Sequence, residues 1–187
     1  LRLRPDEAVV FVGTTPPQMV YFGFTGYVYD RYHLGAPVPD YCTTEGGDKR
    51  QTPDSARNRM PLFASLADTV NNRTVHVSGP GKKPYLKDVV LIAAADRNVE
   101  RRVRKALQKA GYRDETINTI VVSPDLARLG AENEGDSLLF VLRMASEITP
   151  DLESYMASPG TLFRVSPDPP TPPFKLDPLS PPKLRVR

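Results

Sequence analysis

The side chains that could carry out chemistry in this chain are few and widely spaced. Its 187 residues include two histidines, His33 and His76, and one cysteine, Cys42. A serine nucleophile needs an imidazole within hydrogen-bond reach, so Ser65 and His76 with an aspartate form the one triad that we consider. Ser65 lacks the flanking glycines of a nucleophile elbow. Ser65 followed by Asp68 also fits the capping box of a short helix, which explains the same residues without catalysis.

Metal and thiol chemistry have little support in the sequence. Asp30 and His33 could share a metal ion, but the other histidine lies 43 residues further along the chain. One cysteine excludes both a cysteine-rich zinc site and an internal disulfide. Cys42 lies in the polar stretch DYCTTEGG, where no neighbour clearly activates the thiol. We therefore expect no metal site and no cofactor.

Four charged residues are candidate site residues because of their positions in the sequence. Asp30, Asp68 and Asp136 could serve in acid–base catalysis, which requires that carboxyl groups be buried and close together. Arg143 lies inside the apolar segment LLFVLRMA. A charge in such a segment must pair, reach water or face a site. We expect a structural ion pair at Arg143, with anion binding as the alternative.

The stretch PPQMVYFGFTGYVYDR predicts a long strand over residues 19–30, whose alternate side chains face opposite sides. One face, expected in the core, carries Val20, Phe22, Phe24, Gly26 and Val28. The other face carries Met19 and the candidate ligand-binding residues Tyr21, Gly23, Thr25, Tyr27 and Tyr29. Together with Arg143 and a long loop over residues 31–60, these tyrosines could form a pocket. The alternative is that a helix or loop packs on this face, with Gly23 making room for it.

Positive charge is concentrated in one element. The net charge is +3, yet residues 97–113 hold seven Lys or Arg and one acid, Glu100. The cations that we consider for binding phosphates are Arg101, Arg102, Arg104, Lys105 and Lys109. Only Tyr112 could stack on a base nearby, so a solvated helix face is the simplest interpretation. An acidic protein and a nucleic acid are the alternatives, and nucleic acid is the less favoured partner.

Residues 87–122 predict a strand–helix–strand unit. A continuous apolar strand (87–96) precedes a helix with one apolar stripe, for which Asp96 is the N-cap and Gly111 the stop. A second strand (116–122) follows, most simply in a right-handed parallel crossover. Further strands are expected at 8–12, 73–79, 136–146 and 161–166, and short helices at 123–130 and 149–160. The stretch 61–72 is ambiguous, although its capping box would start a short helix. These elements predict the α+β class: a single domain over 1–166 with a mixed sheet of about five to seven strands.

Residues 167–187 predict an extended tail, because eight of the last 22 residues are proline. Its apolar residues could dock on another protein; they are Phe174, Leu176, Leu179, Leu184 and Val186. The alternative is a linker to a further domain. The chain starts without methionine and has basic ends, which suggests a processed piece of a longer product or a shortened form of the natural chain.

Three functions follow, in order of preference. The first is a binding or assembly module, a subunit of a larger complex that docks through the proline-rich tail on another chain or on the rest of its own precursor. The second is an enzyme domain or small-molecule binder that uses the tyrosine face, loop 31–60 and Arg143. The third is nucleic-acid binding through 97–113. No apolar run is long enough to span a membrane, so we expect a soluble protein. Asn72 heads an N-glycosylation triplet and gives a slight preference for a secreted or organelle-processed protein.

Overall fold

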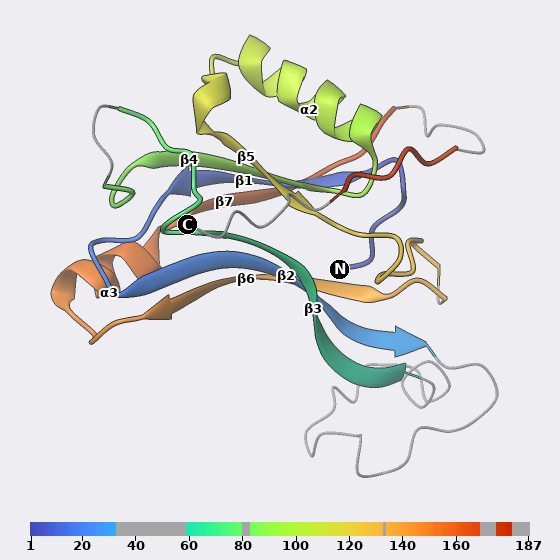
Figure 1. The fold of residues 1–187 in the computed structure, drawn as a ribbon, viewed down its shortest axis with the longest axis horizontal. Helices are drawn as coiled ribbons and strands as arrows, with labels where there is room; N and C mark the ends of the chain where they lie inside the picture. Colours follow the sequence, from blue (N-terminus) through green and yellow to red (C-terminus); the bar gives the residue numbers. More distant parts are fainter. Residues whose placement is uncertain (33–58, 80–82, 133, 169–174, 181–187) are drawn as a thin grey trace.

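The computed structural model of the protein describes residues 1–32, 59–79, 83–132, 134–168 and 175–180 (Figure 1). His33, Cys42 and most of the predicted loop 31–60 lie outside these residues. In the described part, seven strands form two sheets that stack face to face, and two α-helices accompany them. The α+β class and the mixed sheet are confirmed. The strands are divided between two layers, a division that the sequence pattern did not specify.

Sheet A is the upper, four-stranded layer in Figure 1, and it is mixed. β4 pairs with β5 in parallel and with β1 antiparallel, and β1 pairs antiparallel with β7. In spatial order its strands are β5 (Ile117–Val121), β4 (Asp88–Ala94), β1 (Ala8–Thr14) and β7 (Gly160–Val165). β4 reads DVVLIAA because both of its faces are covered, one by α2 and the other by the second sheet.

Helix α2 (Arg97–Lys109) completes the predicted crossover between β4 and β5. The Asp96 carboxylate accepts hydrogen bonds from the amides of Asn98 and Val99, at 2.8 and 2.9 Å, and so caps the helix. Val99 and Val103 pack on the outer face of sheet A. Gly111 follows with a φ of 96°, as the predicted stop requires.

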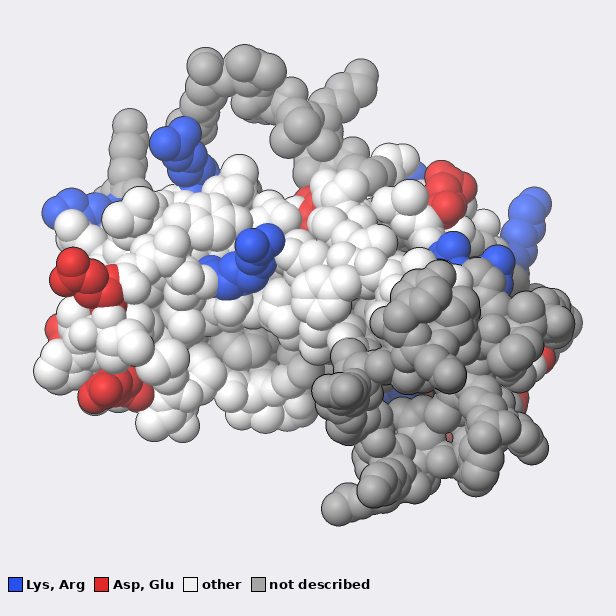
Figure 2. All heavy atoms as spheres, turned by 90° about the horizontal axis from the view of Figure 1, so that it is seen from below, with Lys and Arg blue, Asp and Glu red and all other residues white. Residues whose placement is uncertain are grey.

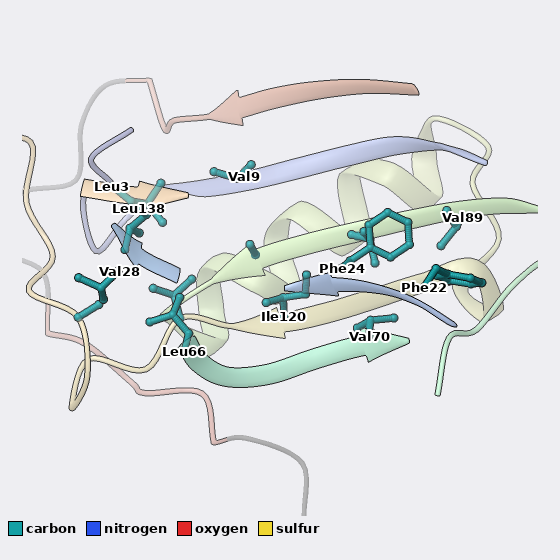
Figure 3. Packing of buried hydrophobic residues seen from close by; sticks show 14 of the residues in the cluster. Leu3, Val9, Phe22, Phe24, Val28, Leu66, Val70, Val89, Ile120 and Leu138 are labelled. Atoms are coloured by element: carbon teal, nitrogen blue, oxygen red, sulfur yellow. The ribbon is translucent and has the colours of Figure 1, made fainter. Parts of the chain in front are cut away.

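Sheet B is antiparallel and has the order β3 (Arg59–Asn71), β2 (Tyr21–Tyr32) and β6 (Ser137–Ala145). Phe22, Phe24 and Val28 point into the core as predicted, where Figure 3 shows them between the two layers. The prediction was wrong for two residues just before the strand. Val20 is 85% exposed and Met19 is buried, because strand alternation begins only at Tyr21.

Two local predictions are wrong, and one ambiguous stretch is resolved. Residues 61–71 belong to β3, where pairing with the long β2 overrides the apparent capping box of Ser65 and Asp68. Residues 73–79 form no strand, because the backbone of His76 forms hydrogen bonds with the Asn118 side chain instead of with a neighbouring strand. Residues 123–130 form a single turn and no helix; beyond it, the Arg128 and Gly130 amides donate to Asp136 and to the Leu3 carbonyl.

One side of the two-layer stack, which we call the closed side, is formed by β3 and β5. The buried Asp68 of β3 accepts a hydrogen bond of 2.8 Å from the amide of Val121 on the edge of β5. Asn118 of β5 exchanges two hydrogen bonds with the backbone of His76, at 2.7 and 2.8 Å. The edge of sheet A is therefore covered by groups of the same chain on this side.

The two ends of the stack are also covered. α3 (Pro150–Ala157) lies within the predicted helix 149–160. It is capped by Thr149 and buries Leu152 and Tyr155 in the core between the sheets. The Tyr155 hydroxyl donates to the Thr14 carbonyl at 3.0 Å, and burial raises the pKa of Tyr155 to about 12. At the other end Leu3 is buried beside Leu138 (Figure 3).

The described part of the tail lies against sheet A and α2. The amide of Asp177 donates to the Asp96 carboxylate at 2.6 Å, and the amide of Leu179 donates to the Ala95 carbonyl at 2.9 Å. Leu176 packs against the core between the sheets, and Leu179 against the cluster beneath α2. Of the tail residues proposed to bind a partner, these two therefore contact their own chain, while Phe174, Leu184 and Val186 lie outside the described residues.

Candidate binding cleft between the two sheets

An apolar cavity of ≈ 280 Å³ lies between the sheets near β6 and β7. Sheet A contributes Val9, Phe11, Leu91 and Ala93 to its wall, and sheet B contributes Phe24, Phe140 and Leu142. Pro159, Gly160 and Leu162 form its border along β7, and Leu162 is 53% exposed. The cavity thus reaches solvent along the side bounded by β6 and β7, which we call the open side.

Within the described ranges, the backbone of β7 is unpaired along the open side. The Thr14 amide donates to the Pro159 carbonyl at 3.1 Å, which makes these two residues a hydrogen-bonded pair of the β1–β7 ladder. Antiparallel ladders alternate, so the next such pairs involve residues 161, 163 and 165. The amides and carbonyls of Leu162 and Arg164 therefore point away from β1, where no strand of the described chain meets them.

The edge of β6 is free in the same way. The amide of Leu138 donates to the Leu1 carbonyl, and the Leu138 carbonyl accepts from the Leu1 amine. The backbone groups of Phe140, Leu142 and Met144 follow at two-residue steps and point to the same edge. No further strand of the described chain pairs with them. Two unpaired strand edges therefore border the mouth of the cavity.

A glycine pair shapes the floor of the cleft. Gly13 and Gly160 are opposite each other in the β1–β7 ladder, and a Cβ on either residue would overlap the Phe11 ring. Gly160 has a φ of 147°, which disfavours other residues. The two glycines leave the space into which Phe11 folds, and this places the ring in the cavity wall.

The described lining of the cleft is mostly apolar and carries no ionisable side chain. Apolar walls next to free backbone donors and acceptors suit an apolar group carried on an extended backbone.

The predicted tyrosine face is the outer face of sheet B, the layer lowest in Figure 1. Figure 2 shows this side as mostly uncharged residues, with one Lys or Arg near the centre. Tyr29 is 45% exposed, whereas Tyr27 is buried against Phe63, with ring centroids 5.2 Å apart. Thr25 is buried as well, and its hydroxyl lies 3.1 Å from that of Thr69.

Gly23 leaves no gap for a ligand on this face. A Cβ there would overlap the hydroxyl of Tyr21, so the tip of that ring already occupies the space beside the glycine. Arg143 donates to the Tyr27 hydroxyl at 2.9 Å and pairs with no carboxylate among the described residues. The ion pair expected at Arg143 is thus replaced by a tyrosine contact. The structure brings Tyr21 beside Gly23 and Arg143 beside Tyr27.

The three candidate aspartates have separate structural partners. Asp136 is fully buried and accepts two hydrogen bonds from Arg31, at 2.9 and 2.7 Å. Asp30 pairs with Arg59. Asp68 spans the closed side, and burial raises its pKa, partly offset by hydrogen bonds from the backbone of Val121 and Thr69. Asp30 and Asp136 are therefore tied up in ion pairs, and Asp68 in backbone hydrogen bonds.

The basic helix keeps only part of its predicted cationic face. Arg104 bonds Glu100 and Asp114, and it also donates to the carbonyl of Ile117 and the hydroxyl of Thr119. Its positive charge is thus used within the chain. Four of the predicted cations remain exposed; they are Arg101, Arg102, Lys105 and Lys109.

Other predicted features have simple surroundings. The Ser65 hydroxyl accepts from the Ala67 amide within β3, and the Asn72 side chain donates to the Val20 carbonyl. Within the described ranges, no group of three or more His, Cys, Asp or Glu could hold a metal ion. No helix in those ranges is long and apolar enough to cross a membrane.

No protein family, curated protein or solved structure matches this chain. The site must therefore be interpreted from its own geometry.

The cleft was missed at the level of sequence. Leu138, Phe140, Leu142 and Met144 alternate with the outward residues of β6, and this pattern predicts only that one face is buried. That the buried face would be partly uncovered depends on which strands are edges. The one local signal was the strand TLFRVS, which carries the apolar residue Leu162. In the structure every residue of β7 is exposed.

Proposed function

We propose that this chain is a binding module that takes up an extended apolar segment of a partner protein along its open side. The segment would pair with β7 as an additional strand of sheet A. Its side chains on the Leu162 face would enter the cavity. Strand addition of this kind gains affinity from backbone hydrogen bonds and specificity from the side-chain pocket.

The observation that carries the proposal is the contrast between the two sides of the stack. On the closed side the edge of β5 is covered by the Asp68 carboxylate and by the backbone of His76. On the open side β7 presents backbone groups that no described strand pairs with, beside an apolar cavity. Its sequence GTLFRV contains no proline and no lysine to block pairing. Natural proteins usually protect such edges, so an unprotected edge beside an apolar pocket favours a binding surface.

The size of the cavity suits a few side chains. Pockets that enclose drug-sized ligands range from about 300 to 1,000 Å³, and this cavity of ≈ 280 Å³ lies at the lower end and is open along one side. A few apolar side chains fit such a space, and the free strand edge explains how their backbone would be held.

The proposed class, a binding or assembly module, is the one expected from the sequence. The proposed contact is the open side instead of the proline-rich tail. Leu176 and Leu179 of the tail pack on their own chain. Partner contacts through the rest of the tail remain a separate prediction.

The test is the binding of a dye-labelled peptide of about nine residues in which leucine and threonine alternate. Its affinity is measured by fluorescence anisotropy for the wild type and for the variant Leu162→Pro. Proline removes the one amide that points to the open edge at this position and leaves the bonds to β1 intact. We expect binding to the wild type and its loss in Leu162→Pro.

Leu162→Ala is the matched control, because it removes the side chain and keeps the amide. We expect this variant to retain strand pairing with at most about a tenfold loss in affinity. Equal binding by wild type and Leu162→Pro would contradict strand addition at β7. If an apolar dye such as N-phenyl-1-naphthylamine binds while the peptide does not, the cavity is a small-molecule site instead.

A further inference from the structure

We propose that the partner segment is amphipathic, with apolar side chains toward the cavity and acidic side chains toward helix α2. This inference rests on the proposed strand addition at β7. It specifies the charge of the side chains on the α2-facing side of the partner strand, which the cavity alone does not determine.

The orientation of α2 identifies which cations face β7. Arg104 reaches the carbonyl of Ile117 and the hydroxyl of Thr119, so the flank that carries Glu100 and Arg104 lies over β5. The Val99–Val103 stripe packs on sheet A. With 3.6 residues per turn, the flank on the other side of this stripe from Glu100 and Arg104 carries Arg102, Lys105 and Lys109. Since β7 and β5 are the two opposite edges of sheet A, this cationic flank overlooks the β7 side.

Among the described residues, the cations of this flank have no counter-charge. Arg102, Lys105 and Lys109 are exposed and make no ion pair in the part of the chain that the structure describes. In contrast, Arg104 and Arg113 pair with Asp114 and Glu115. Of the exposed cations of α2 that form no ion pair among the described residues, three lie on the flank toward the free edge, and Arg101 lies on the solvent face of the helix.

The two faces of β7 differ in what they offer a partner. Leu162 lies opposite Phe11 and faces the cavity, whereas Phe163 and Val165 lie opposite Val10 and Ala8, on the α2 face. A strand paired with β7 would alternate in the same way. Its cavity-facing residues would be apolar, and its α2-facing residues would lie beside Phe163 and below the cationic flank.

The arginines of β6 and β7 add no free charge at this side. Arg164 pairs with the buried Glu7 at 3.3 Å, and Arg143 donates to Tyr27 on the outer face of sheet B. The charge that the second face of a partner strand would meet is therefore that of the α2 flank, which repels lysines. Acidic side chains there meet complementary charge, which sets specificity and speeds association more than it adds affinity.

Three labelled peptides test the inference: leucine alternating with glutamate, with lysine or with threonine. Each is measured with the full chain at about 0.05 M and about 0.5 M NaCl. At the lower salt we expect the glutamate peptide to bind about tenfold more tightly than the lysine peptide, and the difference to shrink at the higher salt. In the double variant Lys105→Glu/Lys109→Glu, the order of the two peptides should invert.

The control variant Arg73→Glu/Lys83→Glu changes the net charge equally, at two exposed cations in the segment between β3 and β4. We expect it to keep the preference of the wild type. If all three peptides bind the wild type alike and the α2 variant changes nothing, the acidic partner is excluded while strand addition stands. If no peptide binds, or if the glutamate peptide binds Leu162→Pro as well as wild type, both proposals fail.

Discussion

Asp68 connects the two sheets on the closed side, and its contribution to the free energy of unfolding depends on pH. It is buried between the sheets, where its carboxylate accepts from the Val121 amide at 2.8 Å. No cation among the described residues pairs with it, and desolvation is the largest cause of its raised pKa. The folded protein therefore holds a proton on Asp68 more tightly than the unfolded chain does.

The sign of the pH dependence follows from this difference. Between the ordinary pKa of an aspartate and the raised value in the fold, the folded state binds more protons, so the Asp68 contribution to stability increases as pH falls. In Asp68→Asn that contribution is absent. We expect the free energy of unfolding of the wild type to rise relative to that of Asp68→Asn between pH 7 and about pH 4, measured by urea unfolding. A constant difference across this range would show that the Asp68 pKa is not raised.

Among the elements, α2 was the most predictable and β3 the least. The apolar spacing of Val99 and Val103, the cap Asp96 and the stop Gly111 are local signals, and each is found where expected. β3 is a strand because β2 needs a partner, although Ser65 and Asp68 also fit a helix start. Pairing between distant segments overrides such local preferences.

The candidate site was harder to predict for the same reason. Alternation assigned Phe24 and Tyr27 to opposite faces of β2 correctly. It could not show that Tyr21 fills the space beside Gly23, or that β7 ends sheet A without a neighbour. Those facts depend on strand order and packing, which a sequence pattern does not contain.

The cap of α2 joins the helix to the tail, and this leads to a prediction at the level of elements. Asp96 accepts from Asn98 and Val99 in the helix and also from the Asp177 amide. We expect Asp96→Ala to lower the free energy of unfolding by about 2 kcal/mol, the upper end for loss of a cap. Trypsin should also cleave faster after Lys175, because the tail loses an anchor.

Thr149→Ala is the matched control, since Thr149 caps α3 and holds no second segment. Thr149→Ala should lower the free energy of unfolding by about 1 kcal/mol and leave cleavage after Lys175 unchanged. Equal cleavage of Asp96→Ala and wild type at that site would show that the tail is held by Leu176 and Leu179 alone.

For the molecule as a whole, the open side is a compromise between stability and binding. A core cavity lined by Phe11, Phe24 and Phe140 forgoes packing that a fully closed stack would have. Proteins commonly accept lower stability where a site must receive a ligand. If the cleft serves binding, filling it from within should stabilise the chain and at the same time weaken uptake of a partner segment.

Ala93 and Ala94 provide a matched pair for this test, because they are neighbours on β4 with opposite orientations. Ala93 lines the cavity, and Ala94 packs beneath α2; they are 3% and 0% exposed. We expect Ala93→Leu to raise the free energy of unfolding by about 1 kcal/mol, since its added methylenes occupy vacant apolar space. Ala94→Leu should lower it by about 1–3 kcal/mol, because the helix interface has no room. Ala93→Leu should also bind the leucine–threonine peptide at least about tenfold more weakly. Stabilisation without weaker binding would place the peptide elsewhere, and destabilisation of both variants alike would show that the cavity is not available to an added side chain.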